Sequence, residues 1–97
     1  MLSFRVSSAS EPGSVAGALA GGIRSCGEAV LVTIGAGALN QAVKAVVIAS
    51  DFLREYETEI AMEPSFSVVD IDGVEKTAIR LRVYAKKRSG IVLRRAG

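Results

Sequence analysis

Asp72 and Gly73 form the sequence feature that most limits how this chain can fold. An Asp-Gly pair between two stretches of alternating apolar and polar residues favours a two-residue type I′ hairpin turn. A turn of that length sets the strand register, because opposite residues then have numbers that sum to 145. The register places Glu59 opposite Lys86 and Glu63 opposite Arg82.

The charge distribution agrees with this register. Residues 51–75 hold eight acidic residues and one basic residue, whereas residues 76–97 hold eight basic residues and no acidic one. Opposite charges facing each other across a hairpin attract by about 0.2 to 1 kcal/mol. We therefore expect much of the charge behind the small net value of +2 to be neutralised within the fold.

One face of the hairpin is expected to be core. Its pairs are Ile60 with Ala85, Met62 with Val83, Phe66 with Ile79, and Val68 with Thr77. Pro64 lacks an amide hydrogen and predicts an edge strand or a bulge that shifts the pairing by one residue.

The residues before the hairpin predict two further strands and two helices. Residues 2–6 alternate as a half-buried strand does, and the β-branched run 29–34 is typical of a central strand. Ser10 is the expected cap of a helix that begins near Pro12 and ends at Cys26 and Gly27, with Cys26 packed as a small apolar residue.

Within that helix, Gly13, Gly17 and Gly21 are expected to permit close approach of a neighbour, and a second helix is expected from Ala38 to about Glu55. The element order predicts an α/β (α+β) two-layer sandwich, βαβαββ, with a four-stranded mixed sheet and two helices.

Length and composition exclude several function classes. A chain of 97 residues supports one modest core, which we place in residues 1–85, with a basic extension over residues 86–97. The chain has no histidine and one cysteine, so we expect no catalytic activity, no metal, no cofactor and no internal disulfide. The longest uncharged stretch is too short to span a bilayer, and we expect a cytoplasmic protein.

A glycine segment and the basic residues are the candidate binding features. Gly35, Ala36 and Gly37 lie between a strand and a helix, where free backbone amides can hold an anion, although Asn40 stands where a dinucleotide fingerprint requires glycine or alanine. Bases neutralise phosphates without reading sequence. The candidate nucleic-acid-binding residues are Arg5, Gly35, Ala36, Gly37, Asn40, Lys44, Lys86, Lys87 and Arg88.

The second helix also carries a candidate interface. On a helical wheel Ile48 falls within the polar arc, next to Ala45 and Phe52, which predicts an apolar strip that the chain's own sheet does not cover. We therefore expect self-association through Gln41, Ala45, Ile48 and Phe52.

Three segments together resemble the stage V sporulation protein S family. They are residues 14–21 (SVAGALAG), residues 34–45 (IGAGALNQAVKA), and Ile71-Asp72-Gly73 with Thr77-Ala78-Ile79. The resemblance covers residues 2–84 and implies an Alba-like fold, a dimer with the second helix at or near the interface, and a bacterial regulator of sporulation or septation. In Alba proteins the arm between the last two strands is basic, whereas residues 70–76 here hold three acids and one base.

Three functions follow as hypotheses. The first is a non-enzymatic dimeric regulator that binds DNA or RNA weakly and without sequence specificity. The alternative is a protein-protein interaction module in sporulation or septation control that uses the acidic hairpin and the surface of the second helix. The third is a sensor of a small anionic ligand at the glycine segment.

Overall fold

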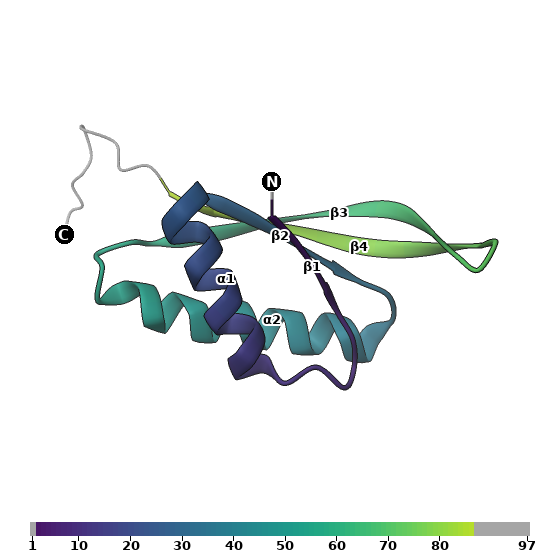
Figure 1. The fold of residues 1–97 in the computed structure, drawn as a ribbon, viewed down its shortest axis with the longest axis horizontal. Helices are drawn as coiled ribbons and strands as arrows, with labels where there is room; N and C mark the ends of the chain where they lie inside the picture. The colour runs from purple at the N-terminus through teal and green to yellow at the C-terminus, as the bar shows by residue number, and fades with distance from the viewer. Residues whose placement is uncertain (1, 87–97) are drawn as a thin grey trace.

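Four strands and two helices make up residues 2–86, the part of the chain that the computed structural model describes. They are β1 (Leu2–Val6), α1 (Pro12–Cys26), β2 (Glu28–Thr33), α2 (Ala36–Arg54), β3 (Ile60–Ile71) and β4 (Val74–Ala85). The strands form one mixed sheet in the order β1-β2-β4-β3, and both helices cover the same face of it (Figure 1). The predicted α+β fold in the order βαβαββ is confirmed. We call the helix-covered face of the sheet its inner face and the opposite face its outer face.

The hairpin register is confirmed over its whole length. β3 and β4 pair from Ile60 opposite Ala85 to Ile71 opposite Val74, and Pro64 lies opposite Leu81 without a shift in register. The predicted bulge is therefore absent between β3 and β4. β3 is an edge strand, where a residue without an amide hydrogen leaves no ladder bond unmade on the solvent side.

The ion pairs that the register predicts across the hairpin are also present. Arg82 Nη1 lies 3.5 Å from Glu63 Oε1, and Lys86 Nζ lies 3.6 Å from Glu59 Oε1. β2 is the predicted central strand, since it pairs with β1 in parallel and with β4 in antiparallel orientation.

The core is shorter than the alternation in the hairpin predicts. Val83 is fully buried, but Met62, Phe66 and Val68 expose 37%, 81% and 64% of their surface. The helices end before the hairpin does, so that its distal part extends beyond them as an arm (Figure 1). The prediction that Phe66 and Val68 belong to the core is wrong, because no helix lies beneath them.

The first helix begins at a different cap from the predicted one. Glu11, not Ser10, is the N-cap, and its carboxylate Oε1 accepts from the Ser14 amide at 2.8 Å and from the Ser14 hydroxyl at 3.1 Å. Ser10 instead closes the preceding loop, where its Oγ accepts from the Ser7 amide. The backbone hydrogen bond from Ser14, followed by one from Gly13, lowers the pKa of Glu11.

This cap predicts a loss of stability in acid. A carboxylate whose pKa is lower in the folded chain contributes stability above its unfolded pKa, near 4.5, and that contribution is lost as the pH falls through the folded pKa. Glu11→Gln keeps the acceptor oxygen and removes the charge, so its urea midpoint should fall less between pH 6 and pH 3. An equal fall of the urea midpoint in the wild type and in Glu11→Gln would contradict a stabilising role for the charge of Glu11 at the helix start.

Close packing of α1 depends on a different glycine from those predicted. A Cβ on Gly22 would lie 2.9 Å from Leu2 Cδ1, whereas a Cβ on Gly17 or Gly21 would meet nothing within 4 Å. Cys26 is exposed rather than packed, and Gly27 ends the helix with a φ of 84°, as predicted. Within residues 2–86, neither helix is long and apolar enough to cross a membrane.

Candidate functional site

The start of α2 is the described surface that best combines positive charge with free hydrogen-bond donors. Gly35 precedes the helix with a φ of 92°, and no side chain caps the first amides. The first turn holds no acidic residue, so nothing on the helix itself offsets the partial positive charge of its N-terminus. Asn40 and Lys44, one turn apart, are both exposed.

The loop between β1 and α1 lies against this helix start. A Cβ on Gly37 would come within 2.9 Å of Ser8 Cβ, so a larger residue at position 37 would displace the loop. Gln41 Nε2 donates to the Ser10 carbonyl oxygen at 2.9 Å and holds the loop from the other side. Exposed Ser8 therefore borders the glycine segment.

Part of the candidate anion-binding set shares one end of α2. Gly35, Ala36 and Gly37 form the helix start, and Asn40 and Lys44 are exposed about one and two turns further along the helix. The serines of the loop were missed because they are about 30 residues away in sequence, and only the close contact at position 37 reveals them. An uncapped helix start with hydroxyls and one lysine can bind a phosphate group through backbone amides.

The remaining basic candidates do not join this cluster. Arg5 alternates with Phe4, which packs on the core, and with buried Val6, so its side chain lies on the outer face of the sheet. Lys86 lies at the end of β4 and pairs with Glu59. Lys87 and Arg88 lie outside the described residues.

Arg82 is neutralised inside the fold. Its Nε donates to Glu28 Oε1 at 2.8 Å, its Nη1 lies 3.5 Å from Glu63 Oε1, and its guanidinium lies 4.4 Å from the centre of the Tyr84 ring. The hydrogen bond to Glu28 raises the pKa of Arg82. We therefore do not include Arg82 among the groups available to a phosphate.

Most of the residues predicted to form an interface on α2 contact the rest of the same chain. Ala45 is fully buried, Ile48 is half-buried against the core, and Gln41 is bonded to Ser10. Ala45 therefore cannot contact a second folded chain. Phe52 exposes 45% of its surface and Val47, which the helical wheel did not single out, exposes 59%.

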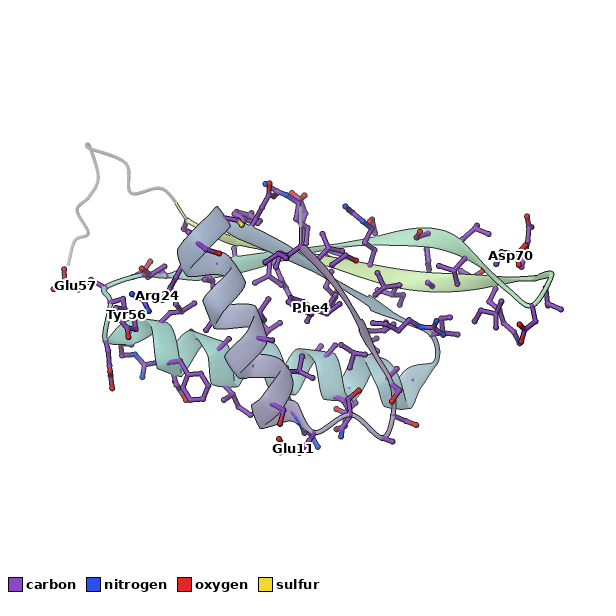
Figure 2. All side chains as sticks on the ribbon, viewed as in Figure 1. Phe4, Glu11, Arg24, Tyr56, Glu57 and Asp70 are labelled. Atoms are coloured by element: carbon purple, nitrogen blue, oxygen red, sulfur yellow. The ribbon has the colours of Figure 1, made fainter. Side chains whose placement is uncertain are left out.

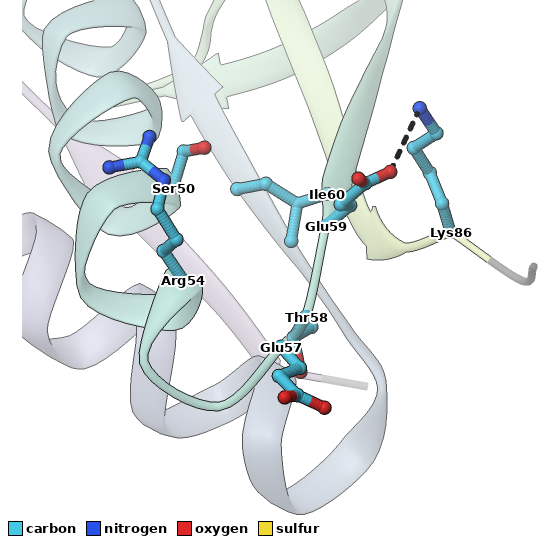
Figure 3. A pocket seen from close by; sticks show the side chains of 7 residues that line it. All are labelled: Ser50, Arg54, Glu57, Thr58, Glu59, Ile60 and Lys86. Carbon is cyan, nitrogen blue, oxygen red and sulfur yellow. Dashed lines mark ion pairs between the residues drawn. The ribbon is translucent and has the colours of Figure 1, made fainter. Parts of the chain in front are cut away.

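The far end of α2 forms a concave surface without net charge. Figure 3 shows the side chains that line it, which are Ser50, Arg54, Glu57, Thr58, Glu59, Ile60 and Lys86. Lys86 pairs with Glu59 there, and Arg54 Nη2 lies 2.9 Å from Asp51 Oδ1. Nearby, the Arg24 guanidinium stacks 3.7 Å from the centre of the Tyr56 ring (Figure 2). Because the two bases and two acids balance, this end offers no preference for an anion.

A comparison with known protein families assigns most of this chain to a family. The model of the family described as Stage V sporulation protein S (SpoVS) matches residues 3–86. The matched region contains all of the described fold except Leu2, including the start of α2 and the hairpin.

Proposed function

The chain belongs to the stage V sporulation protein S family, and from this premise we propose that it is a non-enzymatic cytoplasmic regulator that binds DNA or RNA. Binding is weak and independent of sequence. The family name links the chain to sporulation, and the Alba-like fold that the family resemblance implies supports the nucleic-acid assignment.

The uncapped start of α2 carries the proposal. Its backbone amides, together with exposed Lys44 and Asn40, suit a phosphate group, and they lie beside the serines of the β1–α1 loop. The site offers no aromatic platform and no groove-reading element, which fits contact with the phosphate backbone alone. Lys87 and Arg88 add charge from the basic extension, whereas Arg5 lies on the other face of the sheet.

We expect Lys44→Gln to weaken binding to both duplex DNA and RNA. Loss of one phosphate contact should lower the slope of log affinity against log salt concentration by about 0.9. Titrations of fluorescent duplex DNA and RNA at two salt concentrations measure both quantities. Lys87→Gln with Arg88→Gln tests the extension in the same way.

Arg54→Gln is the matched control, because Arg54 lies on the same helix at its opposite end and already pairs with Asp51. Its affinity should equal that of the wild type. Equal losses in Lys44→Gln and Arg54→Gln would refute the site, and the absence of salt-dependent binding in the wild type would refute the function.

We also propose a dimer that uses the exposed side of α2. Val47, which exposes 59% of its surface, supports this and replaces Ala45 in the candidate interface. Phe52 lies nearer the end of the helix and points about 140° away from Val47 around the helix axis.

A protein-protein interaction module is the second candidate function. The observation that favours it is the distal part of the hairpin, which exposes Phe66. Its tip holds three acidic residues, Asp70, Asp72 and Glu75, which would repel a phosphate backbone.

A further inference from the structure

The distal part of the hairpin, residues 66–79, forms an arm whose inner face is apolar at Phe66, Val68 and Ile79. Phe66 and Val68 project from neighbouring positions of that face and expose 81% and 64% of their surface. Ile79, opposite Phe66, is only half-buried. Exposed apolar residues grouped on one face mark an interaction surface more often than single ones do.

The tip of the arm is acidic. Asp70 and Glu75 face each other one step beyond Val68 on the same face, and Asp72 occupies the turn. Within residues 2–86 none of the three takes part in an ion pair, and Asp70 accepts a hydrogen bond from the Gly73 amide. A partner for this surface therefore needs an apolar segment followed by positive charge.

The C-terminal segment of the chain has that chemistry. Ile91, Val92 and Leu93 are followed by Arg94 and Arg95 and preceded by the basic residues 86–88. We propose that the inner face of the arm binds this segment from a second copy of the chain, with the apolar triplet on Phe66 and Val68 and the two arginines at the acidic tip.

The length of the segment requires a second copy. Lys86 lies opposite the residue before β3, and from there Phe66 is seven strand residues away, roughly 23 Å. β4 runs away from the tip, so a chain leaving its end must first reverse, which takes about two residues. The five residues from Arg88 to Leu93 then span at most about 18 Å. The triplet therefore cannot cover Phe66 of its own copy.

This contact goes beyond the proposed nucleic-acid binding and adds to the proposed self-association. The family match ends at residue 86, so the binding segment belongs to this chain's own extension and not to the matched region.

The experiment titrates the full-length protein with a fluorescent peptide of residues 86–97 and follows the anisotropy. We expect saturable binding that weakens with salt and that falls about tenfold or more in Phe66→Ser. Val74→Ser is the matched control, because Val74 is 56% exposed on the outer face of the same arm, and it should leave binding unchanged. No binding, or equal effects of the two variants, would overturn the proposal.

Charge exchange tests the polar half of the contact. Asp70→Asn with Glu75→Lys should weaken binding of the native peptide, and a peptide with Arg94→Glu and Arg95→Glu should bind this variant better than it binds the wild type. Asparagine keeps an oxygen for the Gly73 amide. Failure of the exchanged pair to recover affinity would refute the placement of the arginines.

Sedimentation tests the requirement for a second copy. In the full chain, Arg94→Glu with Arg95→Glu should lower the weight-average mass at high protein concentration. An unchanged mass would refute contact between copies through the tail, while leaving both the nucleic-acid proposal and the α2 interface standing.

Discussion

Ala45→Glu is expected to unfold the protein, whereas Val47→Glu is expected to leave it folded. Ala45 is fully buried between α2 and the rest of the core, and Val47, two residues later, exposes 59% of its surface. A carboxylate at position 45 would lose its water without gaining a partner and would also exceed the space that alanine fills. Such substitutions cost more than about 4 kcal/mol, a large part of the stability of a domain of this size.

Circular dichroism and urea unfolding of the two variants measure this difference. Val47→Glu serves as the matched control because it introduces the same side chain into the same helix. It should also lower the mass of the protein in sedimentation, since it places a charge in the proposed dimer interface. A folded Ala45→Glu variant with wild-type stability would contradict the position of the core.

The strand register could be predicted from the sequence because it depends on local chemistry. The Asp-Gly turn and the alternation on either side of it favour one pairing, and the ion pairs of Glu63 and Glu59 follow from it. Pro64 left a bulge open as an alternative, which the structure does not contain. The extent of the core could not be predicted in the same way. Alternation shows which face of a strand is apolar, but burial of Phe66 depends on how far the helices reach along the sheet.

The buried side of α2 shows a second limit. A helical wheel gives the angles between residues but not the positions of the neighbouring elements. α2 packs against both the sheet and α1, so its buried arc is wide and centres on small residues such as Ala42, Ala45 and Ala49. Ile48, which looked unpartnered on the wheel, packs against the core, and Val47 is the more exposed of the two large apolar residues that α2 leaves in solvent.

The candidate site was predictable where its residues are consecutive. A glycine segment between a strand and a helix indicates free amides, and the structure places Gly35, Gly37 and Asn40 at the helix start. The serine loop beside them depends on a tertiary contact that no sequence pattern reports.

The two proposals make opposite demands on the basic extension. Lys87 and Arg88 are assigned to the phosphate backbone and Arg94 and Arg95 to the acidic arm of a second copy, yet all four lie within one segment of nine residues, so one contact restricts the other. Both contacts weaken with salt, because both depend on charge. At low salt we therefore expect added nucleic acid to compete with the arm for the fluorescent peptide. Ile91, Val92 and Leu93 add apolar contacts to peptide binding by the arm, and a phosphate backbone offers no such contacts.

At a protein concentration too low for association, Leu81→Ala is expected to destabilise the protein strongly, and Phe66→Ala is expected to change its stability little. Both residues lie in the hairpin and contribute to its inner face, but Leu81 is 1% exposed and Phe66 is 81% exposed. Truncation of a buried leucine removes packed methyl groups and leaves a cavity, at a cost of about 2 to 5 kcal/mol. Truncation of an exposed side chain costs within about 0.5 kcal/mol, because little surface is returned to water.

Urea unfolding measures both values, and an unchanged denaturant slope shows that only stability has changed. A loss in Phe66→Ala as large as that in Leu81→Ala would mean that Phe66 is covered in the protein in solution. Dilution distinguishes the two ways in which it could be covered. A loss that disappears at low protein concentration indicates a second copy on the arm, because association stabilises the folded chain by mass action, whereas a loss that persists places Phe66 in the core of its own chain.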